Sequence, residues 1–68
     1  MNINKNTKFW VVTNPTKDST LEDILFECDL KGLRLQFLGG LSDEQIYKIY
    51  EDKEYATMIA NSLLVAMQ

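Results

Sequence analysis

Cys28 is the residue with the most reactive side chain, in a sequence of 68 residues that holds one cysteine and no histidine. A catalytic thiol needs a nearby base, and histidine is the residue that most often supplies it. Cys28 also follows Leu21, Ile24 and Leu25 at the spacing of one helix face, which is typical of a buried and inert thiol. We therefore expect no catalytic residue and no enzymatic activity. One thiol without an imidazole also makes a poor zinc site.

Carboxylates form two clusters that could run acid–base hydrolysis or hold a divalent cation. Neither cluster has the Asp-x-Asp-x-Asp-Gly spacing of a calcium loop. A solvated helix face explains the clusters more simply, and a binding surface for a basic partner is the next explanation. We therefore expect no metal and no cofactor. The clusters are Asp18, Glu22, Asp23, Glu27 and Asp29, and then Glu51, Asp52 and Glu54.

Two tyrosines lie beside the second acidic cluster. Aromatic side chains can stack on bases, but such platforms accompany basic grooves, and these tyrosines have acidic neighbours. On a helix, both would fall at the flank of the apolar stripe, where a half-exposed tyrosine is typical of a protein-binding hot spot. We predict a partner-binding surface formed by Tyr47, Glu51, Asp52, Glu54 and Tyr55.

The elements that position these residues begin with a strand. Residues 1–7 are polar and rich in asparagine, and we predict a flexible arm there. Aromatic and β-branched residues fill positions 9–13, which predicts a strand at 8–13. The apolar run is continuous rather than alternating, so both faces of this strand should be covered, as in a central or parallel strand.

A helix and a second strand are predicted next. Ser19 or Thr20 as N-cap, the apolar stripe that includes Cys28, and Gly32 as C-cap predict a helix at 20–31. Apolar and polar residues alternate at 33–38, which predicts a strand. A helix that continues through this segment is the alternative, and Gly32 and the alternation favour the strand. Strand, helix and strand would then form a right-handed parallel βαβ unit.

Gly39 and Gly40 precede the last predicted helix. They lack the lysine and the spacing of a phosphate-binding loop, so a turn is expected. Ser42 and Gln45 then have the spacing of a capping box, and a helical period follows. We predict a helix at 42–67, in which Lys53 falls on the apolar side. Either the stem of Lys53 lies along the apolar surface with its ammonium group in water, or the helix breaks near 52–54.

The end of this helix is apolar on almost every side, which is more surface than two short strands and one short helix can cover. We therefore predict a single small α+β domain over residues 1–68, of β-α-β-α order, that forms a homodimer or a higher homo-oligomer. Contact between helices and pairing between strand edges are both open geometries. The predicted oligomer interface is Ala56, Ile59, Ala60, Leu63, Leu64 and Met67.

Charge separates the two ends of the chain. Residues 1–17 carry Lys5, Lys8 and Lys17 without an acid, whereas residues 18–68 carry all ten acidic residues against four basic ones, a net charge of −6. Nucleic-acid binding without sequence preference needs a basic face, so the body of the protein should attract basic protein surfaces instead. No membrane span and no signal peptide are expected, and a lone thiol favours the cytoplasm.

Three classes of function follow from these features. The first is a small acidic protein-binding module of the phage or mobile-element type, an inhibitor or adaptor that occupies a host protein such as a nucleic-acid enzyme. The alternative is a small dimeric transcription regulator that binds DNA through its basic N-terminal arm or a strand. A further alternative is a subunit of a larger complex, docked through its C-terminal helix.

Overall fold

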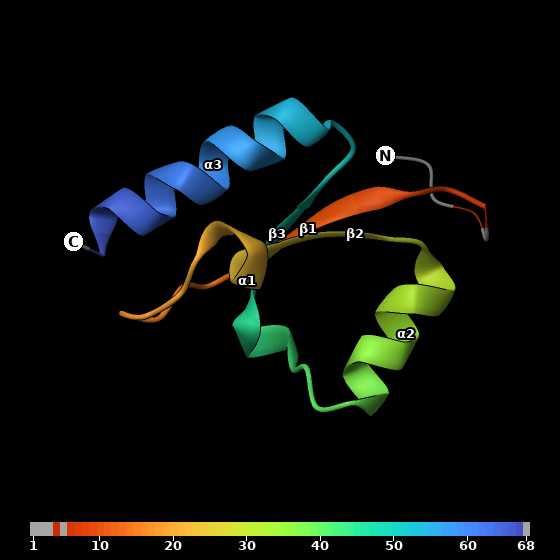
Figure 1. The fold of residues 1–68 in the computed structure, drawn as a ribbon. Helices are drawn as coiled ribbons and strands as arrows, with labels where there is room; N and C mark the ends of the chain where they lie inside the picture. The colour runs from red at the N-terminus through yellow and green to blue at the C-terminus, as the bar shows by residue number, and fades with distance from the viewer. Residues whose placement is uncertain (1–3, 5, 68) are drawn as a thin grey trace.

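A three-stranded antiparallel sheet with helices on its two faces forms the fold (Figure 1). The computed structural model describes residue 4 and residues 6–67. The antiparallel sheet and the helices that cover it confirm the prediction of an α+β fold. The elements in chain order are β1 (Phe9–Thr13), α1 (Leu21–Ile24), β2 (Leu25–Cys28), α2 (Leu30–Leu38), the 3-10 turn η1 (Asp43–Gln45), β3 (Ile46–Tyr50) and α3 (Lys53–Ala66).

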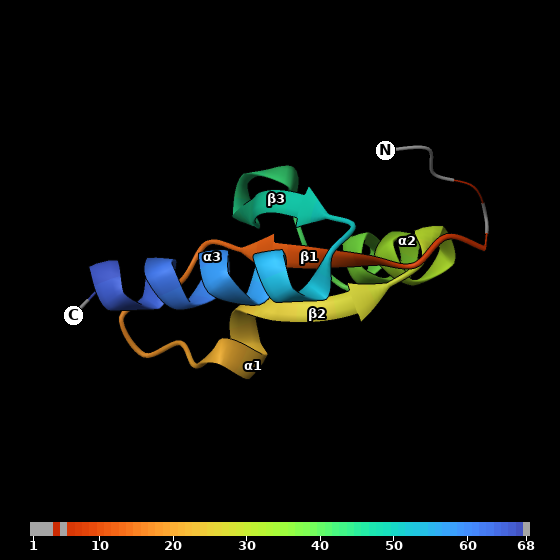
Figure 2. The ribbon, with the colours of Figure 1, turned by 90° about the horizontal axis from the view of Figure 1, so that it is seen from above.

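The first strand, β1, is the centre of the sheet, and the strand order is β2-β1-β3 (Figure 2). Val11 pairs with Phe26 of β2 on one side and with Ile49 of β3 on the other. Phe9, Val11 and Val12 are completely buried. The continuous apolar run thus marks a strand that is covered on both faces, as predicted, and its central position rather than a parallel pairing explains the pattern.

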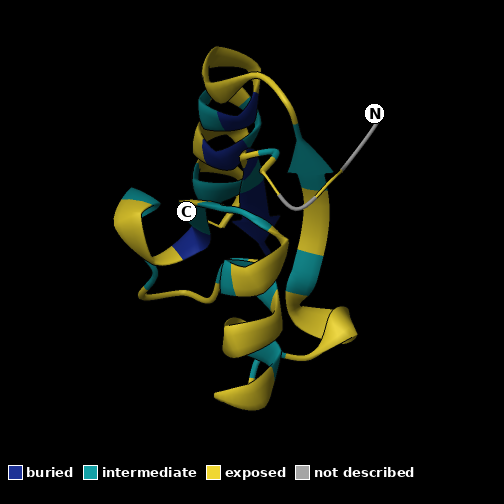
Figure 3. Cartoon of the chain, turned by 90° about the vertical axis from the view of Figure 1, so that its right-hand side faces the viewer, coloured by how far each residue is buried: buried dark blue, intermediate teal, exposed yellow. Residues whose placement is uncertain are grey.

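Each face of the sheet is covered by a different part of the chain. On one face, Val12 packs with Ile24 of α1 and with Ala56 and Ala60 of α3, and all four side chains are buried. The small alanine side chains let the α3 backbone approach the sheet closely. The segment from α2 to η1 lies on the opposite face (Figure 1). Figure 3 shows buried residues where α3 meets the sheet, whereas α2 contains no buried residue.

The predicted helix at 20–31 is wrong beyond its first turn. The helix α1 ends at Ile24, and Leu25–Cys28 pairs with β1 as a strand. Leu25, Phe26 and Cys28 are only partly buried, and Leu25 and Cys28 continue the spacing of Leu21 and Ile24, so the run resembles the stripe of a helix. Phe26 lies off that stripe, and its pairing with Val11 shows that the run is a strand.

The predicted strand at 33–38 is also wrong, because Leu30–Leu38 forms α2. The alternative of a helix through this segment is correct. Asp29 is its N-cap and accepts a hydrogen bond from the Gly32 N–H at 2.8 Å. Gly32 therefore lies in the first turn of a helix and is not a C-cap. A Cβ atom on Gly32 would lie 3.1 Å from the Cβ of Cys28, so glycine permits the close contact of β2 and α2.

The end of α2 has the geometry of a Schellman motif. The Leu41 N–H donates to the Gln36 carbonyl at 3.0 Å, and the Gly40 N–H donates to the Phe37 carbonyl at 3.2 Å. Gly40 has a φ of 117°, which side chains rarely allow. The predicted turn at Gly39-Gly40 is thus a helix terminus. The predicted parallel βαβ unit is absent, since both strand pairs of the described residues are antiparallel.

The predicted helix at 42–67 consists of three separate elements. Ser42 and Gln45 do form a capping box, but it caps only the short turn η1. Ile46–Tyr50 is β3, because its isoleucine and tyrosine residues have a high preference for strands and the segment pairs with β1. Asp52 is the N-cap of α3, and the helix begins at Lys53. The position near 52–54 is therefore the change from a strand to a helix and not a break within one helix.

The N-terminal segment lies only partly within the structure. Of the predicted flexible arm, residues 1–3 and 5 lie outside the described residues. Within the arm, the Thr7 N–H donates to the Asn4 carbonyl at 3.1 Å, and the Asn4 N–H donates to the Thr7 hydroxyl at 3.2 Å.

In residue 4 and residues 6–67, no helix combines the length and the apolar character needed to cross a bilayer.

Candidate partner-binding corner

The turn from β3 to α3 brings most of the predicted partner-binding residues together. Glu51 and Asp52 form the turn, and the Asp52 side chain accepts a hydrogen bond from the Glu54 N–H at 3.2 Å. This cap fixes the direction in which α3 leaves the sheet. As a result, the ring of Tyr55 in the first turn of α3 lies against the ring of Tyr50 at the end of β3. The ring centroids are 5.3 Å apart and the planes are tilted by 54°.

The third tyrosine, Tyr47, belongs to the same neighbourhood. Val12 pairs with Lys48 and Thr13 pairs with Ile46, so Tyr47 is the extra residue of a β-bulge. Tyr47 and Tyr55 are 47% and 48% exposed, which agrees with the half-exposed state predicted for them. Burial raises the pKa of Tyr50, and the nearby hydroxyls of Tyr47 and Tyr55 raise it further.

A shallow pocket of about 370 Å³ opens at this corner. Three of the predicted residues line it, namely Glu51, Asp52 and Tyr55. Ile49 and Tyr50 complete the lining, although sequence reasoning assigned them to the buried stripe of a long helix. Glu54 and Tyr47 lie outside the lining. The β-branched and aromatic residues of 46–50 favour a strand, and they are the signal that could have identified the two missed residues.

The rings on this side of the sheet already attract ammonium groups. The Lys53 Nζ atom lies 5.3 Å from the centroid of the Trp10 ring, and the Lys48 Nζ atom lies 5.9 Å from that of Tyr50. Trp10 and Tyr50 are cross-strand partners. Aromatic faces with carboxylates beside them form an environment that favours cations. The pocket can therefore receive an ammonium or guanidinium group between a tyrosine ring and the carboxylates of the turn.

The predicted oligomer interface divides into two groups. Ala56 and Ala60 are 0% exposed within their own chain, where they pack against Val12 and Ile24. Ile59, Leu63 and Leu64 are half-buried, and Met67 is 43% exposed. The apolar face of α3 that suggested self-association is covered by the chain's own sheet. A homodimer stays a prediction, and the apolar side chains that α3 exposes most are Met58 and Val65.

The remaining candidates for chemistry are the Cys28 thiol and the carboxylate clusters. Cys28 is half-buried, and burial raises the pKa of its thiol, as do the neighbouring carboxylates of Asp29 and Glu27. A raised pKa keeps the thiol protonated and weakly nucleophilic at neutral pH. Among residue 4 and residues 6–67, no three cysteine or carboxylate side chains are grouped to hold a metal ion.

The fold and the corner together define a small α+β protein with an aromatic and acidic surface pocket. Comparison of the chain with protein-family models, with curated proteins and with solved structures gives no match. The function is therefore argued from the geometry of the chain itself.

Proposed function

We propose that this protein is a protein-binding module whose Tyr50–Tyr55 corner receives a lysine or arginine side chain of its partner. The observation that carries the proposal is the shared pocket of two tyrosines and the Glu51-Asp52 turn. The cation would lie against the exposed ring of Tyr55, with the carboxylate of Asp52 close by. Both interactions favour a positively charged group over a neutral one of the same size.

The strength of such a contact sets the kind of partner. A cation–π contact at an exposed site contributes about 0.5–1 kcal/mol, and a surface ion pair contributes about 0.2–1 kcal/mol. One inserted side chain alone would bind weakly, so a stable complex needs a broader basic surface around it. The net charge of −6 on residues 18–68 supports a partner with a broad basic surface, because the charge steers such surfaces toward the chain.

An inhibitor or adaptor of the phage or mobile-element type would act in this way, by covering a basic surface of a host protein in the cytoplasm. A nucleic-acid enzyme, whose groove is basic, is a suitable target of this kind. The transcription regulator is the competing proposal, and it uses the lysines at the other end of the chain.

The direct test is an NMR titration of the ¹⁵N-labelled protein with a short arginine-rich peptide, compared with the same peptide carrying glutamine in place of arginine. We expect saturable shifts at Tyr50, Glu51, Asp52 and Tyr55 with the arginine peptide only. Added salt should weaken the binding. A titration that leaves these amides unmoved contradicts the proposal.

Two matched pairs of variants separate the charge and the ring from the fold. Asp52→Asn removes the charge and keeps a good N-cap, whereas Asp43→Asn removes an equal charge from η1. Tyr55→Leu removes the ring, and Tyr55→Phe keeps it. Binding should weaken several-fold in Asp52→Asn and Tyr55→Leu and stay near that of the natural chain in the other two. Equal weakening in Asp43→Asn would mean that only overall charge matters.

A duplex DNA titration in the same buffer tests the competing proposal. DNA binding that disappears in Lys8→Gln and Lys17→Gln variants would favour the transcription regulator. In that outcome, the arginine peptide should leave the corner unmoved.

A further inference from the structure

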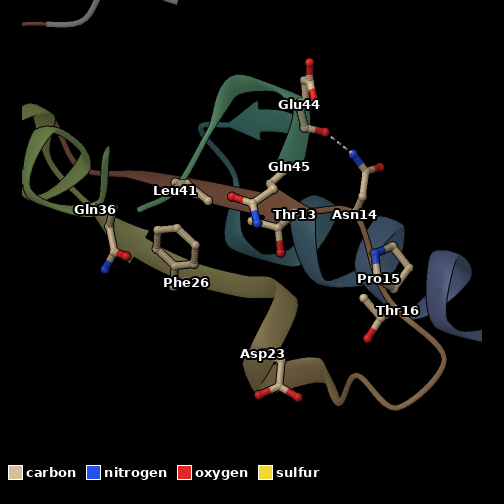
Figure 4. Close-up of a pocket in the computed structure, with 10 residues that line it drawn as sticks. All are labelled: Thr13, Asn14, Pro15, Thr16, Asp23, Phe26, Gln36, Leu41, Glu44 and Gln45. Carbon is tan, nitrogen blue, oxygen red and sulfur yellow. Dashed lines mark hydrogen bonds between the residues drawn. The ribbon is translucent and has the colours of Figure 1, made fainter. Parts of the chain in front are cut away.

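A second cleft, with a volume of about 520 Å³, lies on the face of the sheet opposite α3 (Figure 4). Its walls come from the end of β1 and the loop after it, from α1, β2 and α2, and from the segment that ends in η1. Phe26 and Leu41 provide apolar surface, and the Thr13 hydroxyl and the Gln45 side chain lie beside it, whereas the Asn14 amide turns toward Glu44 at the rim of the cleft (Figure 4). None of the residues that line this cleft lines the pocket at the tyrosine corner.

The hydroxyl of Thr13 is the first sign that the cleft is a binding site. Thr13 is 9% exposed, yet its hydroxyl forms no hydrogen bond with any described residue. Within the described chain, no fully enclosed polar side-chain atom lacks a partner. The Thr13 hydroxyl must therefore reach the open space of the cleft that it lines. A nearly buried hydroxyl without a protein partner is costly unless water or a ligand bonds to it.

Two amide side chains beside Thr13 are held with one end free. The Asn14 amide nitrogen donates to the Glu44 carbonyl at 3.1 Å, which leaves its oxygen as an acceptor. The Gln45 side-chain oxygen accepts a hydrogen bond from the Ser42 N–H at 2.8 Å, which leaves its amide nitrogen as a donor. The existing bonds fix the orientation of each amide. The cleft thus presents the Gln45 donor and the Thr13 hydroxyl, which can donate or accept, and the Asn14 acceptor lies at its rim.

Charge decides which ligands this set can take. No lysine or arginine lines the cleft, whereas two acidic residues, Asp23 and Glu44, do. Phosphate or carboxylate groups would be repelled and would find no counter-charge. The polar groups suit a neutral ligand, and the Phe26 ring offers an aromatic surface for a flat one.

We propose that this cleft binds a small uncharged planar ligand with a donor and an acceptor on one edge, as in a nucleobase or an aromatic carboxamide. The ring of the ligand lies against Phe26, and its polar edge bonds to Thr13 and Gln45. This site is independent of the partner-binding corner, so either proposal can fail without the other. For a ligand of roughly 10–20 heavy atoms, binding in the high micromolar to millimolar range is expected.

The experiment is a ¹⁵N NMR titration with adenosine, cytidine, nicotinamide and adenosine monophosphate as separate probes. We expect saturable shifts at Asn14, Phe26 and Gln45 with at least one neutral probe. Nucleosides and nicotinamide distinguish a nucleobase site from a carboxamide site. Adenosine monophosphate should bind more weakly than adenosine, because its phosphate meets the two acidic residues. Tighter binding of the monophosphate overturns the charge argument, and no shift with any probe at millimolar concentration overturns the site.

Thr13→Val is the decisive variant, because valine replaces the hydroxyl with a methyl group of nearly the same shape. The unpaired hydroxyl contributes nothing within the chain, and valine suits a strand, so the variant should fold normally. We expect the affinity for the best probe to fall about tenfold, the effect of one lost hydrogen bond to a nearly buried group. Thr13→Ser should retain most of the affinity, and Asn61→Ala, an exposed change on α3 outside both pockets, should leave it unchanged. Equal affinity in Thr13→Val refutes the assignment.

Discussion

Asn14 joins the end of β1 to η1, thirty positions later in the chain, by two hydrogen bonds. Its side-chain nitrogen donates to the Glu44 carbonyl at 3.1 Å, and its backbone N–H donates to the Gln45 carbonyl at 2.7 Å. The two bonds anchor the segment between α2 and β3 to the central strand. Through this contact, the residues on both sides of the large cleft are held at a fixed separation.

Removal of the Asn14 side chain tests how much this contact stabilises the fold. Asn14→Ala keeps the backbone bond and loses the side-chain bond, which is exposed to solvent. We expect the free energy of unfolding to fall by about 0.5–1 kcal/mol. Urea unfolding, followed by the fluorescence of the single tryptophan Trp10, measures this change in the free energy of unfolding. Asn61→Ala, an exposed change within α3, is the control and should be neutral or slightly stabilising. Equal stability of Asn14→Ala and the natural chain would show that the side-chain bond contributes nothing.

The burial of Ala60 predicts that a larger side chain destabilises the fold on one side of α3 and is tolerated on the exposed side. Ala60 is 0% exposed against the sheet, whereas Ala66 on the same helix is exposed. Ala60→Leu must force side chains or backbone apart, and we expect a loss of about 1–3 kcal/mol in the free energy of unfolding. Ala66→Leu should change it by less than about 0.5 kcal/mol. Thermal unfolding by circular dichroism compares the two, and similar values would mean that α3 does not pack as described.

The adjacent glycines that end α2 should respond differently to the same substitution. Gly40 has a φ of 117°, whereas Gly39 has a φ of −83°, an ordinary helical value. Gly40→Ala should therefore lower the free energy of unfolding by about 1–2 kcal/mol. Gly39→Ala should be neutral or stabilise the fold by up to about 1 kcal/mol, since alanine reduces the freedom of the unfolded chain. Chemical unfolding of both variants gives the comparison, and an equal loss would rule out the Schellman geometry.

Short runs of sequence predict the elements that depend on residue preferences and caps within a few positions. The aromatic and β-branched run at residues 9–13 predicts β1 and its covered faces. Asp52 is the N-cap of α3, so the lysine that conflicts with the apolar stripe of the predicted long helix marks the residue where α3 begins. The acidic tyrosine surface is also recovered in part, because Glu51, Asp52 and Tyr55 are near neighbours in the sequence.

The remaining elements depend on contacts that no short window of sequence contains. Leu25–Cys28 has the spacing of a helix, and pairing with β1 makes it a strand. Residues 46–50 likewise become a strand by pairing with the other side of β1. The alternating run at 33–38 lies outside the sheet and forms a helix capped by Asp29. The large cleft is assembled from segments far apart in sequence, which is why sequence reasoning missed Thr13, Phe26 and Gln45.

The capping box of α1 gives the fold a dependence on acidic pH. The Thr20 N–H donates to the Asp23 carboxylate at 2.8 Å and the Thr20 hydroxyl donates at 3.0 Å, and these bonds lower the pKa of Asp23 below 3.8. A carboxyl whose pKa is lower in the folded state stabilises the fold above its unfolded pKa. The stabilisation is lost as the pH falls through the folded pKa.

Asp23→Asn tests this dependence. The melting temperature of the natural chain should exceed that of the variant near neutral pH, and the difference should shrink as the pH falls below about 4. Asp18→Asn removes the same charge from the preceding loop, so it controls for the change in net charge. A difference that stays constant down to low pH would show that the carboxylate form is not favoured by the fold.

Tyr50 gives the corresponding dependence at alkaline pH. Burial and the neighbouring hydroxyls of Tyr47 and Tyr55 raise its pKa above 10.0, because the folded chain favours the neutral phenol. Its contribution to stability is therefore fully present below the unfolded pKa and is lost as the pH rises through the folded pKa. Ultraviolet absorbance titration of the folded protein should show a tyrosine step above pH 10 that Tyr50→Phe removes. Tyr55→Phe should move this step to lower pH, since the variant removes a neighbouring charge. A Tyr50 step that Tyr55→Phe leaves in place would indicate that burial alone sets the shift, and that the tyrosines of the corner are not electrostatically coupled.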